Sequence, residues 1–135
     1  MTTPRLFTLE EASALLPVLA PLLEELRQKM AVLDRKQGEL QAAGEQRRGG
    51  NGYHLAAEQQ ATRLQREVER LTNELKDDLE TVLGYGCEVK DIRTGLIDFR
   101  SLREGRVVYL CWRLGEPAIE HWHELDAGFA GRQRL

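Results

Sequence analysis

The chain has little cysteine: its 135 residues contain two, Cys87 and Cys111, and it shows no secretory signal. Disulfide frameworks belong mainly to secreted domains with several regularly spaced cysteines. We therefore expect two reduced thiols and no disulfide. Stability must then come from a packed core, and a chain of this length can bury roughly two thirds of its unfolded surface in a single domain.

Long apolar runs are also lacking. The longest, residues 12–23, has twelve residues, contains two prolines and follows two glutamates. A helix that spans a bilayer needs roughly 20 apolar residues, and an export signal begins with basic residues. The sequence therefore predicts a cytoplasmic protein without a membrane partner.

Positive charge is not in excess. The net charge is −3; residues 1–86 carry 11 lysines and arginines against 14 aspartates and glutamates, and residues 87–135 carry 8 against 8. Proteins that neutralise nucleic-acid phosphates present a basic patch or stripe. We therefore expect no nucleic-acid partner.

The first half of the chain has the apolar spacing of a long helix, predicted over residues 8–43. Thr8 and Glu11 form a capping-box pattern at its start. Pro17 and Pro21 interrupt the hydrogen-bond ladder, so we expect a kink near them. The apolar stripe recurs every three or four residues, at Leu15, Leu19, Leu22, Leu26, Met30, Leu33 and Leu40.

Residues 44–52 are rich in glycine and arginine and predict a polar loop. A second helix is predicted over residues 53–84, followed by glycines that end it. Its stripe comprises Ala57, Ala61, Leu64, Val68, Leu71, Leu75, Leu79 and Val82. Two amphipathic helices with a short connection pack as an antiparallel hairpin. The spacing also suits a coiled coil, so self-association as a homodimer, or binding of another protein, is expected through this hairpin.

Beyond residue 86 the apolar period becomes alternating, which indicates strands. We predict a β-meander over residues 87–127, with an arginine-rich turn at residues 100–106, and a C-terminal tail over residues 128–135. The fold class is therefore α+β: a long antiparallel helical hairpin followed by a small antiparallel sheet of three or four strands, in a single domain over residues 1–135.

The run CWRLGEPAIEHWHELD is the candidate functional site, because it concentrates ligand-type and aromatic side chains around an expected hairpin. If residues 115–117 form a three-residue loop, Cys111 lies opposite His121 and Tyr109 opposite His123, and the tryptophans reach the core side. A slip of one residue would instead place both histidines on the core side. We favour the first register.

The first register suggests a divalent transition-metal site, because two histidines at i and i+2 on a strand can bind one ion with a thiolate or carboxylate. The candidate ligands are His121, His123, Cys111, Glu124 and Asp126. The alternative interpretation of His123 is a half-buried, hydrogen-bonded structural side chain. A Cys111–His121 nucleophilic pair is disfavoured, because the sequence shows no nucleophile elbow and no third orienting residue.

Arg113, Glu116 and Arg132 form either an ion-pair network that holds the C-terminal tail or a clamp for an anion. Structural closure is the favoured interpretation. Gly128 and Gly131 predict a turn that tucks the Phe129 ring into the core.

Three segments, FTLEEASALLP, EVKDIRTGLIDF and REGRVVYLCWRLGEPAIEHWHELDAGFAGR, resemble the uncharacterised prokaryotic family catalogued as domain of unknown function 2203. The resemblance covers nearly the whole chain except the glycine-rich loop. It implies a bacterial cytoplasmic protein and supplies no activity. In the family pattern the place of His121 is often aromatic, and the recurring positions correspond to Glu116, Trp122, His123, Glu124, Gly128, Phe129 and Arg132.

Two functional hypotheses follow. The first is a non-enzymatic interaction or ligand-binding module that self-associates through its hairpin, since no catalytic constellation is recognised and no cofactor is required. The second is a metal- or anion-binding protein with a site around His123. Its binding candidates are Arg113, Glu116, Trp122, His123, Glu124 and Arg132.

Overall fold

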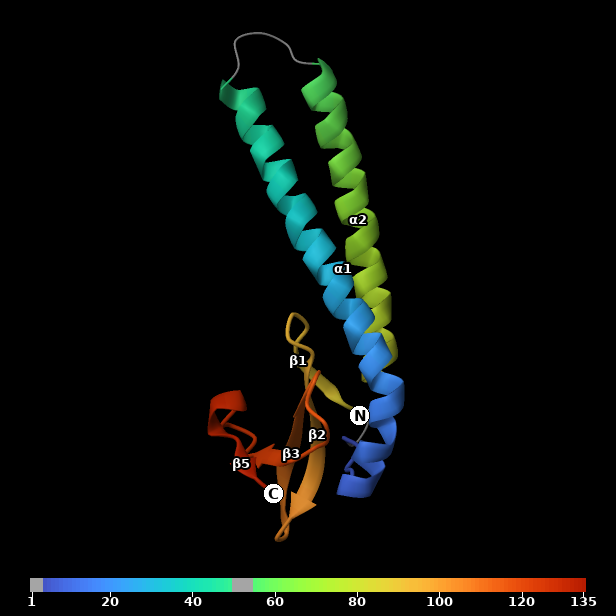
Figure 1. Ribbon diagram of the computed structural model, residues 1–135, viewed down its shortest axis with the longest axis vertical. Helices are drawn as coiled ribbons and strands as arrows, with labels where there is room; N and C mark the ends of the chain where they lie inside the picture. Colours follow the sequence, from blue (N-terminus) through green and yellow to red (C-terminus); the bar gives the residue numbers. More distant parts are fainter. Residues whose placement is uncertain (1–3, 50–54) are drawn as a thin grey trace. The chain divides into compact units, whose positions relative to one another are not determined.

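The computed structural model describes residues 4–49 and 55–135, with two helices followed by an antiparallel sheet (Figure 1). This confirms the predicted α+β class. The chain forms two compact units: residues 28–77 make the helical unit, and residues 1–27 with 78–135 make the sheet unit.

The helical unit is built from parts of α1 (Leu9–Gly49) and α2 (Leu55–Leu83). Its buried apolar side chains keep the helical spacing that the sequence shows: Leu33, Ala43, Ala61, Leu64, Leu71 and Leu75. An ion pair joins the two helices, with Lys36 Nζ 2.6 Å from Glu67 Oε2. The predicted hairpin is therefore present, held by its apolar stripes and by charged pairs beside them.

Helix α1 is longer than predicted, because it continues through Gly44 to Gly49. The expected loop was therefore wrong for residues 44–49, and its remainder, residues 50–52, lies outside the described part of the chain. A single glycine costs a helix roughly 1 kcal/mol, which alanine and glutamate neighbours such as Ala42, Ala43 and Glu45 offset.

The start of α1 follows the predicted capping box. The Thr8 amide donates to Glu11 Oε1 at 3.0 Å, and the Glu11 amide donates to Thr8 Oγ1 at 3.1 Å. The helix then runs through Pro17 and Pro21 without a break. Prolines remove backbone hydrogen bonds, and burial of Leu19, Leu23 and Leu26 favours the continuous helix.

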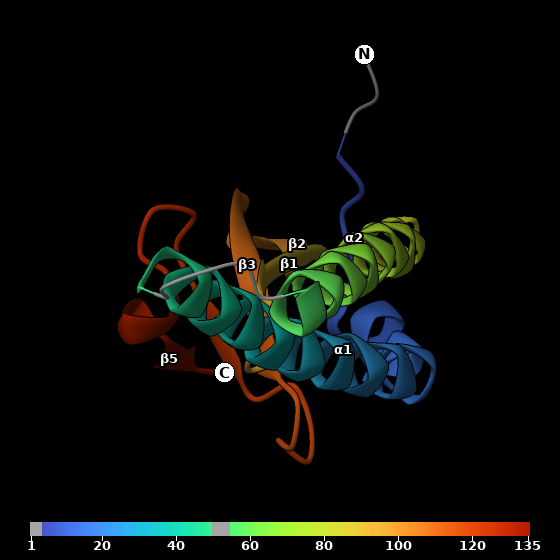
Figure 2. The same ribbon diagram turned by 90° about the horizontal axis from the view of Figure 1, so that it is seen from above.

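The sheet has five strands in the order β1-β2-β3-β4-β5, so every neighbour in space is a neighbour in sequence. The bounds are β1 Glu88–Asp91, β2 Leu96–Arg103, β3 Arg106–Arg113, β4 His121–His123 and β5 Gln133–Arg134. Strands β1, β2 and β3 lie side by side in both views (Figure 1 and Figure 2).

Two details of the sheet differ from the prediction. The predicted tail contributes a fifth strand, and the predicted arginine-rich turn is mostly strand, since β2 extends to Arg103 and the turn is confined to Glu104 and Gly105. Arginine is compatible with a strand whose face is partly exposed, and here the cross-strand pairs of β3 decide the structure.

The register between β3 and β4 is the favoured one: Tyr109 pairs with His123 and Cys111 with His121. Alternation then divides the sheet into two faces. One is apolar and contains Ile97, Phe99, Val108, Leu110, Trp112 and Trp122, all buried. The Phe7 ring packs edge-on against Phe99 with centroids 5.1 Å apart. The other face carries the polar residues of the site.

Candidate metal site

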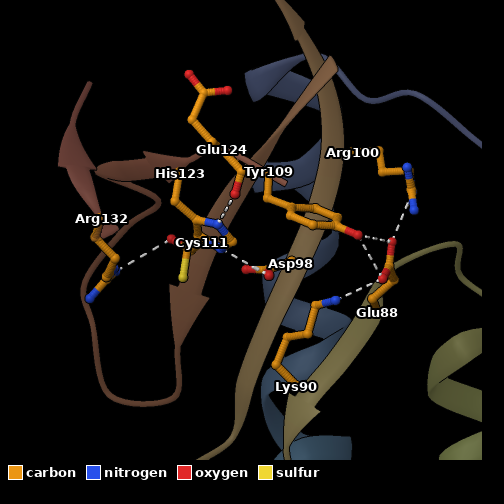
Figure 3. Close-up of polar contacts among 9 residues, drawn as sticks. All are labelled: Glu88, Lys90, Asp98, Arg100, Tyr109, Cys111, His123, Glu124 and Arg132. Atoms are coloured by element: carbon orange, nitrogen blue, oxygen red, sulfur yellow. Dashed lines mark hydrogen bonds and ion pairs between the residues drawn. The ribbon is translucent and has the colours of Figure 1, made fainter. Parts of the chain in front are cut away.

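Three adjacent strands contribute to one cluster on the polar face of the sheet: Asp98 from β2, Cys111 from β3 and His123 from β4 (Figure 3). Asp98 is the cross-strand partner of Cys111. His123 is the cross-strand partner of Tyr109, which lies two residues before Cys111 on β3, so His123 and Cys111 are diagonal neighbours. Because the pleat sends alternate side chains to one face, these three converge.

The cluster is closed to solvent. Asp98 is 1%, Cys111 0% and His123 2% exposed. One possible ligand atom from each side chain lies within 4.8 Å of the other two. Buried carboxylates and imidazoles are rare unless they are paired or coordinate a metal ion, so the cluster needs a chemical explanation.

Both ring nitrogens of His123 are engaged. Nδ1 lies 2.7 Å from the backbone carbonyl oxygen of Glu124, and Nε2 lies 3.0 Å from Asp98 Oδ2. A carbonyl oxygen only accepts, so Nδ1 must carry a proton. One further proton then lies between Nε2 and Oδ2, and the Asp98–His123 pair is neutral overall whichever atom holds it.

Asp98 is only half satisfied. Its Oδ1 is buried and has no hydrogen-bond partner among the described residues. Burial raises the pKa of the Asp98 carboxyl, although His123 and the Cys111 thiol partly oppose this. An unpaired buried oxygen costs about 1–3 kcal/mol, so this atom could accept a further bond within the cluster.

Cys111 is held as a thiol. Burial, and then the nearby Asp98 carboxylate, raise its pKa to about 12. Arg132, whose Nη2 lies 3.5 Å from the Cys111 carbonyl oxygen, opposes this shift. The thiol is therefore inert as a nucleophile at neutral pH, which agrees with the low expectation for a Cys111–His121 pair.

The three side chains fit a divalent transition metal. Thiolate, imidazole and carboxylate are zinc-type ligands, with bond lengths of about 2.0–2.3 Å that place tetrahedral ligand atoms roughly 3.3–3.8 Å apart. The three ligand atoms lie within 4.8 Å of one another, so they would have to move closer together to match. The Nδ1–H···O=C bond of His123 to Glu124 is the arrangement that orients metal-binding histidines.

A second polar group borders the cluster. The Tyr109 hydroxyl donates to Glu88 at 2.9 Å, and Glu88 also pairs with Lys90 and Arg100, each at 2.9 Å. Figure 3 shows this group beside the Asp98–His123 pair. The centroids of the Tyr109 and His123 rings are 5.3 Å apart, so the hydrogen bond from Tyr109 to Glu88 fixes a ring that packs against the cluster.

Three of the predicted metal ligands lie outside the cluster. His121 Nδ1 lies 3.9 Å from Glu116 Oε2, Glu124 pairs with Arg106, and Asp126 is exposed. Neighbouring residues on a strand point to opposite faces, so Glu124 does not lie on the face of His123. Strand β4 ends at His123, so Asp126 lies beyond the sheet and its carboxylate does not reach the cluster.

The predicted network of Arg113, Glu116 and Arg132 is present as a structural closure. The Arg113 amide donates to Glu116 Oε1 at 2.7 Å, and Arg132 Nη2 lies 2.8 and 2.9 Å from the two Glu116 oxygens. The prediction for Phe129 was wrong: the residue is 41% exposed, and the guanidiniums of Arg113 and Arg132 lie 5.2 and 4.7 Å from its ring centroid. Trp122 lies on the apolar face, under Arg103 and Arg106.

Sequence reasoning missed Asp98, which lies outside the run that drew attention. One signal was available: Asp98 interrupts the apolar run Leu96–Phe99 at a position that pairs with Cys111. A charged residue inside a buried strand marks a buried polar site.

Comparisons with known proteins identify a family and no activity. A family described as "Uncharacterized conserved protein (DUF2203)" matches residues 5–135. The searches of curated proteins and of solved structures find no match. Within the described part of the chain, neither helix is both long and apolar enough to cross a membrane.

Proposed function

Because the chain belongs to the DUF2203 family, whose description contains no activity, we propose a function from the site itself. The protein binds one divalent transition-metal ion through Asp98, Cys111 and His123. The observation that carries this proposal is the buried Asp98 carboxyl: its Oδ1 has no hydrogen-bond partner among the described residues, and a thiol and an imidazole lie within 4.8 Å of one of its oxygens.

Charge balance supports the proposal. The metal-free cluster is neutral, with one proton on the Asp98–His123 axis and one on Cys111. A divalent ion that displaces these two protons leaves a carboxylate, a thiolate and two positive charges, so the site stays neutral. A buried site that exchanges two protons for one divalent ion avoids the cost of an uncompensated charge.

Zinc is the ion that the ligand set favours. A thiolate and an imidazole are softer ligands than magnesium or calcium prefer, and with one carboxylate oxygen of Asp98 they give three protein donors. The three donors are buried, so we propose that the ion stabilises the fold rather than meeting a substrate. The ion would tie β2, β3 and β4 together, in a non-enzymatic protein.

Cobalt(II) titration of metal-free protein tests the proposal, because thiolate–cobalt bonds give a charge-transfer band and tetrahedral cobalt gives visible absorption. We expect both to saturate at one ion per chain and to disappear when zinc is added. Cys111→Ser should remove the charge-transfer band, and Asp98→Asn should weaken binding about 10- to 100-fold or more.

His121→Ala is the matched control. It removes an imidazole from the same strand, two residues from His123, that does not belong to the cluster. It should bind cobalt as the parent does. Equal titrations of the parent and of Cys111→Ser would reject the site. So would a loss of binding in His121→Ala alone.

We also propose that the protein is bacterial and cytoplasmic and that its hairpin self-associates. The two free cysteines, both buried, support a reducing compartment. The hairpin supports self-association less strongly, because among its residues 28–45 and 55–77, whose exposure is described, the large exposed apolar side chain is Leu55. A homodimer would therefore depend on the charged helix faces, and sedimentation equilibrium at tens of micromolar tests it.

A further inference from the structure

An apolar cleft lies in the sheet unit, away from the polar face. It has a volume of about 390 Å³ and is bounded by the segment before α1, the first turn of α1, and the ends of β2 and β3. Its floor includes Val108 and Leu110, and the Phe7 amide, which donates to the Arg100 carbonyl at 2.7 Å, fixes the segment beside β2. This volume is within the roughly 300–1,000 Å³ of small-molecule pockets.

The walls of the cleft expose leucines. Leu6, Leu9 and Leu135 line it, and they are 42%, 39% and 42% exposed. Single exposed leucines need no explanation, but three around one cleft form an apolar patch of the kind that binds a ligand.

Two polar groups meet this apolar surface. Ser101 is 7% exposed, and its hydroxyl makes no hydrogen bond among the described residues. Arg103 also lines the cleft, with its guanidinium 4.7 Å from the Trp122 ring, and it has no carboxylate partner in the part of the chain that the structure describes. A guanidinium stacked on an aromatic ring keeps its N–H donors free at the edge.

We propose that this cleft binds a medium-chain fatty acid, with the alkyl chain against Phe7, Val108 and the exposed leucines and the carboxylate at Arg103 and Ser101. An anionic head is favoured because Arg103 is uncompensated, whereas the acidic residue of the cleft, Glu11, already accepts from the Thr8 amide and lies 4.0 Å from Arg5. The arrangement of apolar walls with few convergent polar groups is typical of ligand pockets.

Octanoate, titrated into the full-length ¹⁵N-labelled protein and followed by NMR, tests this proposal. We expect saturable shifts at Leu9, Ser101 and Leu102. Acetate, which has the head without the chain, should give none. Octyltrimethylammonium, which has the chain with the opposite charge, should bind at least about tenfold more weakly, because a charge-assisted hydrogen bond to arginine is lost.

Arg103→Met keeps the stacking on Trp122 and removes the charge, so octanoate should bind about tenfold more weakly or worse. Arg113→Met is the matched control, since Arg113 also stacks on a ring, that of Phe129 at 5.2 Å, away from the cleft. It should bind octanoate as the parent does. Leu6→Asp, at a side chain that lines the cleft and is exposed enough to spare the fold, should also weaken binding.

Three results would overturn the proposal. The first is the absence of saturable shifts at the cleft. The second is equal binding of octanoate and octyltrimethylammonium, or equal binding by the parent and Arg103→Met. The third is a change in the NMR signals of the cleft residues with protein concentration when no ligand is present, which would assign the cleft to a second copy of the chain.

Discussion

At the residue scale, His123 decides how the polar face of the sheet is organised. It is buried, it donates from Nδ1 to the Glu124 carbonyl, and its Nε2 shares a proton with Asp98. The structural role expected from the sequence and the metal role proposed above are compatible. The Nδ1–H bond to the Glu124 carbonyl orients the ring in both, and a metal ion would replace the proton between Nε2 and Asp98.

His123→Ala should destabilise the metal-free protein by about 1–3 kcal/mol, because it leaves the buried Asp98 and the Glu124 carbonyl without their partner. Urea denaturation of metal-free protein measures this. His121→Ala, at a side chain 27% exposed, should stay within about 0.5 kcal/mol of the parent. Equal stabilities of the two variants would contradict the structural role.

Metal affinity should rise with pH. The pKa of Cys111 is raised to about 12, so its thiol is protonated near neutrality and its proton must leave when a metal binds. The proton between Asp98 and His123 must leave too, so two protons are released for each ion. Calorimetry in buffers of different ionisation enthalpy counts them, and Cys111→Ser should release one fewer. A count that the variant does not change would contradict the assignment of Cys111.

At the element scale, the connection from β3 to β4 is fixed by Glu116, which binds the Arg113 amide and the Arg132 guanidinium. Gly131 adds to this closure, because a Cβ at that position would lie 2.6 Å from Ala127 Cβ. This connection also carries the backbone from Cys111 to His123, so it supports the register that brings them together.

Glu116→Gln should lose stability at pH 7 by about 1–3 kcal/mol, which is typical of a hydrogen bond to a charged group. Burial raises the pKa of Glu116, but Arg132 and the Arg113 amide outweigh burial and lower it below its usual 4.5. The contribution is therefore complete above about pH 4.5 and is lost as pH falls through the folded pKa. The difference in unfolding free energy between the variant and the parent should therefore be smaller at acid pH than at pH 7. Glu120→Gln is the control: its pair with Arg134 is exposed, so its unfolding free energy should stay close to that of the parent at both pH values.

Thr8→Ala should cost about 0.5–2 kcal/mol of unfolding free energy, because it removes a helix cap. Thr72→Ala is the control, since the Thr72 hydroxyl binds the Val68 carbonyl inside its own helix and alanine is a better helix former. Thermal unfolding compares the two. A Thr72→Ala variant less stable than Thr8→Ala would contradict the capping account.

At the scale of the whole molecule, local spacing predicted most of the fold and part of the site. Apolar periods predicted both helices and the antiparallel sheet. The register expected from a three-residue loop predicted the pairing of Cys111 with His121, although the connection from β3 to β4 is longer and spans residues 114–120. Asp98 could not be assigned a role this way, because its position beside Cys111 depends on pairing between β2 and β3. Strand β5 escaped prediction because two residues carry no detectable alternation.

The central claim is that Asp98, Cys111 and His123 bind one metal ion, and the metal content of protein purified without an affinity tag tests it most directly. We expect about one equivalent of zinc per chain, lost in Cys111→Ser and kept in His121→Ala, with thermal stabilisation when zinc is returned to metal-free protein. Less than about a tenth of an equivalent of any transition metal, together with no zinc-dependent rise in melting temperature, would contradict the claim.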